Sequence, residues 1–159
     1  MIIALGADHG GFPLKSIVID AITSAGHEIL DLGTFDETPV DYPDYAKSVA
    51  DSIVNKRSDR GIILCGSGVG ACVAANKVVS IRAGLCHDTY SAHQGVEHDS
   101  MNVLCIGARI IGPELVKELV PAFLGARFVG DDPGEERHAR RVGKVRRIEE
   151  GIINLMEQK

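Results

Sequence analysis

Short apolar runs alternate along the chain with stretches in which apolar residues recur every three or four positions. The runs predict strands at 2–6, 28–32, 61–65, 81–86 and 102–106. The periodic stretches predict amphipathic helices, beginning with the stripe formed by residues 14, 17, 18, 21 and 22. Strands that alternate with helices indicate a parallel sheet with helices on both faces. The pattern therefore predicts a three-layer α/β/α fold.

The later helices have recognisable boundaries. Prolines suit the first turn of a helix, so Pro43 and Pro113 each open one, and Gly125 ends the second. Three more helical segments are expected at 71–77, 91–97 and about 135–156. The one hinge-like break, GDDPG at 130–134, precedes the last helix. Without repeats or a long linker, residues 1–159 are expected to form a single domain whose last helix packs on a partner subunit.

Composition excludes several classes of protein. The 159 residues are 45% apolar and 25% charged, as in ordinary globular domains. Aromatic residues make up 4% and the net charge is −5, which disfavours nucleic-acid binding. The apolar N-terminus is too short for a signal peptide, and no membrane partner is expected. The four cysteines lack CxxC spacing, so we expect reduced thiols in a cytoplasmic protein.

Polar side chains gather where the predicted strands end. Ligands of open parallel sheets bind beyond the carboxyl ends of the strands. Asp8 and His9 follow the first strand, and the glycine loop 66–70 follows the third. His98 and Asp99 precede the fifth strand. On this topology we expect His9 and His98 to flank one cleft, where a histidine can bind phosphate or move a proton. Each could equally be an ordinary surface histidine.

Cys65 lies between an apolar strand and the glycine loop. Backbone N–H groups and a helix N-terminus there are expected to lower the pKa of its thiol, which would make it a base or a nucleophile. The alternative is a small buried apolar residue, which is the interpretation kept for Cys72, Cys86 and Cys105.

The glycine loop has three interpretations. Residues 66–71 fit the GxGxx[G/A] dinucleotide pattern, but they follow the third strand instead of the first. A cysteine-phosphate loop would need an arginine where Ala71 stands. The third interpretation, which we favour, is an anion hole in which backbone amides and the Ser67 hydroxyl stabilise a negatively charged oxygen.

The last helix concentrates positive charge. It carries six of the 17 Lys and Arg residues within eleven positions. Arg137 and Arg141 are four apart, so both could grip one phosphate. The alternative is a solvated helix face paired with neighbouring glutamates. A metal site could in principle be built from Asp8, His9 and His98, but no HxxxH or HExxH spacing supports it.

Taken in order, seven motifs identify a resemblance. The chain resembles the type B ribose-5-phosphate isomerase family, which includes galactose-6-phosphate and allose-6-phosphate isomerases. The matching segments are Ala7-Asp8-His9-Gly10-Gly11, Val40-Asp41-Tyr42-Pro43-Asp44-Tyr45-Ala46, Cys65-Gly66-Ser67-Gly68-Val69-Gly70, Ala74-Ala75-Asn76-Lys77, Ile81-Arg82-Ala83, Met101-Asn102-Val103-Leu104 and Arg137-His138-x-x-Arg141. The resemblance implies a Rossmann-like five-stranded parallel sheet of order 2-1-3-5-4 with a C-terminal helix.

The resemblance also implies a chemistry. It implies a metal- and cofactor-free aldose–ketose isomerase that acts on a phosphorylated sugar, ribose 5-phosphate first among them, through a cis-enediolate. The implied enzyme is a homodimer or dimer of dimers with sites between subunits. In the implied mechanism, Cys65 moves the proton, and the enediolate is stabilised by Ser67 and the amides of Gly66, Gly68 and Gly70. The sugar ring is opened by Asp8 and His98. The phosphate is held by His9, Arg137, Arg141 and Arg109, and Tyr42 lies near the sugar.

One departure bears on the substrate. Most members have Asn where this chain has Asp99, and an ionised carboxylate accepts hydrogen bonds but cannot donate them. Either Asp99 pairs with His98 or the preferred sugar differs, so other four- to six-carbon sugar phosphates stay open. Two other classes also stay open: a nucleotide- or CoA-binding module built on the glycine loop, and an interaction protein built on the basic helix.

Overall fold

The sheet of this protein is parallel throughout and follows the strand order β2-β1-β3-β5-β4. The computed structural model describes the backbone of residues 1–157 and the side chains of residues 1–151. Its strands are β1 (Ile2–Ala7), β2 (Glu28–Asp31), β3 (Arg60–Cys65), β4 (Ala83–Leu85) and β5 (Val103–Gly107). The predicted sheet and its order are confirmed, although β4 is shorter than its apolar run suggested.

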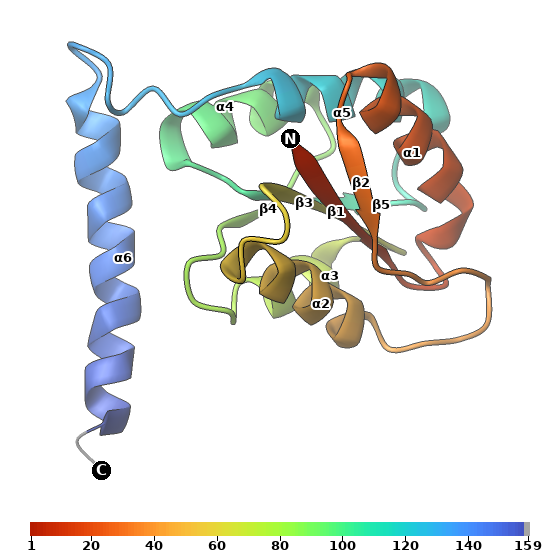
Figure 1. The fold of residues 1–159 in the computed structure, drawn as a ribbon, viewed down its shortest axis with the longest axis horizontal. Helices are drawn as coiled ribbons and strands as arrows, with labels where there is room; N and C mark the ends of the chain where they lie inside the picture. Colours follow the sequence, from red (N-terminus) through yellow and green to blue (C-terminus); the bar gives the residue numbers. More distant parts are fainter. Residues whose placement is uncertain (158–159) are drawn as a thin grey trace.

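Helices cover both faces of the sheet (Figure 1). On one face lie α1 (Lys15–Ser24), α4 (Thr89–Asp99) and α5 (Pro113–Gly125), and on the other α2 (Tyr42–Val54) and α3 (Val69–Ala75). Two buried clusters result, one on each face, with β-strand residues contributing alternate side chains to each. The three-layer architecture is therefore confirmed, and it brings the carboxyl ends of all five strands to one edge.

The last helix, α6 (Glu136–Glu157), stands beside the body instead of covering the sheet (Figure 1). Val142 is buried, whereas Val145 and Ile148 on the same helix are 46% and 66% exposed. A groove of about 630 Å³ separates α6 from β4 and α4. The exposed apolar side chains of α6 fit the predicted packing on a partner subunit, which the single chain does not test.

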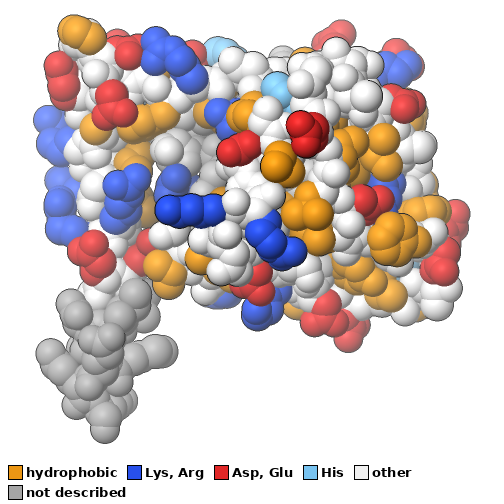
Figure 2. Space-filling view, viewed as in Figure 1, with side chains coloured by type: hydrophobic (Ala, Val, Ile, Leu, Met, Phe, Trp, Pro, Cys, Tyr) orange, Lys and Arg blue, Asp and Glu red, His pale blue; other side chains and the backbone are white. Residues whose placement is uncertain are grey.

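The basic residues of α6 are mostly free of acidic partners in the part of the chain whose side chains are described. Figure 2 shows Lys and Arg side chains gathered over this helix. Arg137 pairs with Glu135 at 2.7 Å, and none of the other five predicted cluster members has a recorded ion pair among the described side chains. The alternative interpretation, a solvated helix face paired with neighbouring glutamates, therefore holds for one of the six basic residues, Arg137. None of the described helices is long and apolar enough to cross a membrane.

Candidate active site

Asp8 and Cys65 lie side by side where the neighbouring strands β1 and β3 end. The register pairs Ala7 with Leu64, and the Asp8 amide donates to the Leu64 carbonyl at 3.0 Å. Both side chains are buried, and Asp8 is near enough to Cys65 to influence the pKa of the thiol. The other Asp8 contact is with the Gly11 amide, which donates to Oδ1 at 2.8 Å. The structure thus brings these two predicted residues together.

The environment of Cys65 raises the pKa of its thiol above the ordinary value of 9.0. Burial is the largest cause, followed by the hydrogen bond to Asp8, and the Asp8 charge adds to both. The amides of Gly68 and Gly66 act in the opposite direction, as the loop predicts, but they do not prevail. The expected lowering of this pKa is therefore wrong, because the carboxylate and burial outweigh the amides.

A second thiol gives an internal comparison. The pKa of Cys72 is lowered to about 7 by its contact with Cys105. Iodoacetamide reacts with thiolates, so we expect alkylation of Cys72 to level off a little above neutral pH, while alkylation of Cys65 still rises beyond pH 9. Asp8→Asn removes a charge that raises the Cys65 pKa and should shift its profile to lower pH. Peptide mass spectrometry separates the two sites, and an unchanged Cys65 profile in Asp8→Asn would contradict the assigned cause.

The glycine loop requires its glycines. Gly68 directly precedes α3 as its N-cap, with a φ of +78°, and a Cβ on it would lie 2.6 Å from Leu85 Cδ1. A Cβ on Gly70 would lie 2.8 Å from the ring of Tyr42, so the tyrosine covers the loop. The exposed Ser67 has its Oγ 3.4 Å from the Val69 amide. Tyr42 and Ser67 therefore lie at the same loop as Cys65.

Two further side chains border this loop. The Arg109 guanidinium lies 3.6 Å from the position of a Cβ on Gly66, and the Arg109 amide donates to the Gly66 carbonyl at 3.0 Å. His87 Nε2 accepts from the Gly107 amide at 3.0 Å, and Gly107 pairs with Cys65 across the sheet. His87 directly follows the predicted strand at 81–86, and the sequence analysis gives it no function. A backbone donor from β5 could not be predicted from its spacing.

His9 is held in one tautomer. The Val40 amide donates to Nδ1 at 3.1 Å, so the proton of the neutral ring lies on Nε2, which can donate to a ligand. Val40 belongs to the loop between β2 and α2. The buried Lys15 fixes the start of this loop, since its Nζ donates to the Thr34 carbonyl at 2.6 Å and pairs with Asp31 at 2.7 Å. Lys15 of α1 and Asp31 of β2 thus hold the loop whose Val40 amide orients His9.

His98 lies at the opposite edge of the sheet. It is at the end of α4, which returns from the carboxyl edge to the start of β5, and Arg82, which precedes β4, donates to the Ser100 carbonyl at 2.7 Å. Gly107 pairs with Cys65 and lies four residues beyond the start of β5, or about 13 Å along the strand. The expectation that His9 and His98 flank one cleft of the chain is wrong, because a residue before a strand lies at its amino end.

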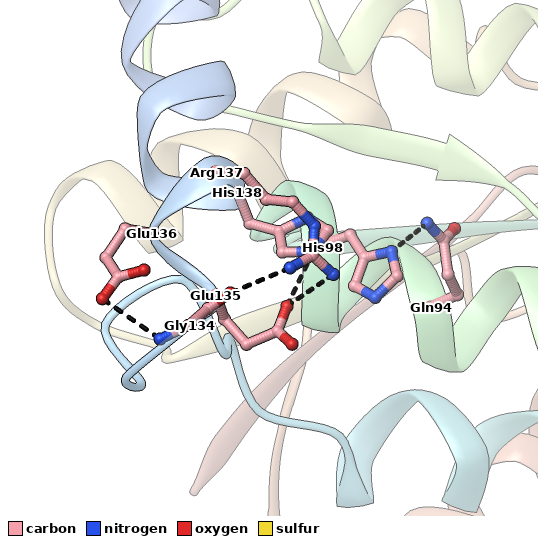
Figure 3. Close-up of polar contacts among 7 residues, drawn as sticks. All are labelled: Gln94, His98, Gly134, Glu135, Glu136, Arg137 and His138. Atoms are coloured by element: carbon pink, nitrogen blue, oxygen red, sulfur yellow. Dashed lines mark hydrogen bonds and ion pairs between the residues drawn. The ribbon is translucent and has the colours of Figure 1, made fainter.

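His98 belongs to a second cluster with the start of α6 (Figure 3). Its ring stacks on His138 with 3.9 Å between centroids, and Gln94 Nε2 lies 2.7 Å from its Nδ1. Arg137 is turned toward Glu135, whereas Arg141 and Asp99 line the groove beside α6. Asp99 thus faces the groove, and in the described part of the chain the partner of His98 is Gln94. Arg137 and Arg141 do not converge on one point here.

The predicted residues therefore form two half-sites. The first, called here the thiol half-site, holds Asp8, His9, Tyr42, Cys65, Ser67, the loop glycines and Arg109. The second, called the histidine half-site, holds His98, Asp99, Arg137 and Arg141. Among the residues described, no group of three or more His, Cys, Asp or Glu side chains could hold a metal ion.

Comparison with known proteins gives consistent results. The sequence matches the Ribose/Galactose Isomerase family over residues 3–145. It is 42% identical to ribose-5-phosphate isomerase B of Escherichia coli over 148 residues, covering 93% of this chain and 96% of that protein. A D-erythrulose-4-phosphate isomerase of Pectobacterium atrosepticum is 44% identical over 131 residues, covering 80% and 85%.

Solved structures agree with the sequence matches. Ribose-5-phosphate isomerase B of Clostridium thermocellum superposes with a TM-score of 0.90 at 41% identity, covering 96% of this chain and 99% of that one. A type B ribose 5-phosphate isomerase of Trypanosoma brucei superposes with a TM-score of 0.87 at 40% identity, covering 92% and 97%. The chain therefore belongs to the ribose/galactose isomerase family and is an aldose–ketose isomerase of sugar phosphates.

Proposed function

We propose that the protein interconverts ribose 5-phosphate and ribulose 5-phosphate through a cis-enediolate. The observation that carries this proposal is the placement of two buried side chains, Asp8 and Cys65, at the adjacent ends of β1 and β3, next to the glycine loop. A proton-transfer site for enolisation needs one base, donors for the developing oxyanion and an anchor for the phosphate. Relatives named for this reaction share most of the chain's length.

Each step uses a group of the thiol half-site. Cys65, as thiolate, removes the proton from C2 of the open-chain aldose. The proton of the C2 hydroxyl then passes to the C1 oxygen, and the thiol returns its proton to C1, which leaves the carbonyl at C2. The electron pair moves onto the carbonyl oxygen, where the loop amides and the Ser67 hydroxyl donate hydrogen bonds to the enediolate. Before the reaction, Asp8 accepts a hydrogen bond from the Cys65 thiol. Together with His98, Asp8 also assists opening of the sugar ring. His9 Nε2 and Arg109 are available as donors to the phosphate.

The complete site needs both half-sites, and we propose that they come from two chains. His98 lies at the amino end of the sheet and Arg141 lines the groove beside β4, whereas Cys65 lies at the carboxyl end of β3. The exposed apolar side chains of α6 and its free arginines support docking of this helix on a second subunit. A homodimer or dimer of dimers would then place Arg137 and Arg141 of one subunit on the phosphate bound by the other.

Asp99 is proposed to influence which sugar is preferred. It lines the same groove as Arg141, at a position where the family resemblance implies an amide. Asp99→Asn should change the relative kcat/KM among four-, five- and six-carbon sugar phosphates by about 1–3 kcal/mol, the scale of one polar contact. Glu149 lines the same groove, so Glu149→Gln is a control for lost charge alone. Identical substrate rankings in Asp99→Asn and wild type would exclude this role.

A panel of four- to six-carbon sugar phosphates tests the proposed substrate directly. We expect ribose 5-phosphate to give the highest kcat/KM, without added metal or nicotinamide. Higher values for a tetrose or hexose phosphate would reassign the substrate within the same chemistry. Loss of activity in EDTA with recovery on adding a divalent ion would contradict the metal-free mechanism.

The cytoplasm is the proposed location, supported by four cysteines that are all unpaired.

A further inference from the structure

His138 is a buried histidine to which the sequence assigned no function. It lies in the first turns of α6 and is 2% exposed. Its ring stacks on His98 at 3.9 Å between centroids, with 25° between the planes (Figure 3). Neither of its ring nitrogens has a hydrogen-bond partner among the described residues, although Glu135 Oε2 approaches Nε2 to 3.2 Å. The principal contact of His138 with α4 is therefore the face of its ring.

His98 is held on two sides as a result. Gln94, one turn earlier on α4, contacts Nδ1 at 2.7 Å and fixes the rotation of the ring. His138 covers one face and fixes the tilt of the ring plane. In the described part of the chain Nε2 of His98 has no recorded hydrogen bond, so it is the ring nitrogen left to meet a ligand. A general acid or base must be placed to within a fraction of an ångström to be effective.

We propose that His138 is a positioning residue, whose ring holds the imidazole of His98 in the orientation required for opening the sugar ring. This inference rests on the proposed function, since it takes His98 as the ring-opening group. It also explains why α6 begins where it does, because the first turn of α6 delivers the supporting ring directly onto the end of α4.

The charges around His138 favour this role. The groups that face it are His98 on α4, and Glu135, Arg137 and Arg141 at the start of α6. Burial lowers the pKa of His138, and His98 and both arginines lower it further, while Glu135 opposes them. These influences favour the neutral form of the His138 ring. A charged neighbour would repel a proton arriving on His98, whereas a neutral ring supports it without that cost.

The inference can be tested by separating ring opening from proton transfer. Ribose 5-phosphate has a free C4 hydroxyl and exists mainly as a furanose that must open. Erythrose 4-phosphate cannot form that ring, because its C4 oxygen carries the phosphate. A ring-opening defect should therefore slow the pentose phosphate and spare the tetrose phosphate. A relative named D-erythrulose-4-phosphate isomerase makes the tetrose phosphate a reasonable second substrate.

Two variants provide the comparison. His138→Leu keeps much of the volume but removes the flat ring, and we expect kcat with ribose 5-phosphate to fall by about 10–100-fold, the effect of a misplaced group. His138→Phe restores a flat neutral ring and should remain within about threefold of wild type, since no hydrogen bond of His138 is lost. Both variants should turn over erythrose 4-phosphate at the wild-type rate, which also shows that they are folded.

Each other outcome overturns a definite part of the argument. Wild-type kinetics in His138→Leu, an equal defect in His138→Phe, or an equal loss with both substrates would refute the positioning role. If the wild type acts only on the pentose phosphate, the Leu and Phe variants decide the matter alone, provided that their unfolding midpoints agree. A wild type inactive with every sugar phosphate would refute the proposed function instead.

Discussion

Cys65→Ala is expected to lower kcat by about 10²–10⁴-fold, the usual loss when a general base is removed. The thiol is the group at the end of β3 that can take a carbon-bound proton, and an alanine side chain has no atom that can replace it. KM should change little, because the proposed phosphate contacts of His9 and Arg109 do not involve the thiol. Initial rates with ribose 5-phosphate measure both constants.

Cys86→Ala is a suitable control for this experiment. Cys86 is also buried, and burial raises the pKa of its thiol to about 11, but it packs in the core on the α1, α4 and α5 side of the sheet. We expect it to lose stability without a comparable loss of kcat. Near-normal turnover in Cys65→Ala would exclude Cys65 as the base. A wild type without turnover, whose binding of sugar phosphate is unchanged in Cys65→Ala, would favour a phosphate-binding module.

The sheet and the thiol half-site could be predicted because their signals are local. Strands such as Arg60–Cys65 are apolar on both faces, as in a covered parallel sheet, and residues that directly follow parallel strands must meet at one edge. Asp8 and Cys65 are therefore neighbours once β1 and β3 are adjacent. The strand order itself came from the family resemblance and not from the pattern of apolar residues.

The remaining features depend on contacts between distant segments. The thiol pKa of Cys65 rises because a carboxylate and burial outweigh two amides, a balance that spacing cannot reveal. His138 meets His98 because the segment between α5 and α6 crosses α4, where the Val129 amide donates to the Glu97 carbonyl at 3.0 Å. The predicted position of His98 is wrong because α4 runs back toward the amino ends of the strands, so a residue just before β5 lies at the amino end of the sheet.

Mixing two inactive variants is expected to restore activity. Cys65→Ala damages the thiol half-site and Arg141→Ala damages the histidine half-site, so each homodimer should be nearly inactive. If the complete site combines half-sites from two chains, a mixed dimer holds one site with both defects and one with neither. Random reassembly makes half of the dimers mixed, each with one intact site, so activity should recover to roughly a quarter of wild type.

The positions of the two residues in one chain support the proposal that two chains supply them. Cys65 lies at the carboxyl edge of β3, while Arg141 lines the groove between α6 and the β4 edge of the sheet. The matched control mixes the single variant Cys65→Ala with the double variant Cys65→Ala/Ser67→Ala. Both proteins are damaged in the thiol half-site, so no intact site can form. Subunit exchange is verified by native mass spectrometry with one chain tagged. A fully exchanged mixture of Cys65→Ala and Arg141→Ala that stays inactive would place the phosphate anchor on the same chain as the thiol, and the arginines of α6 would then need a different role.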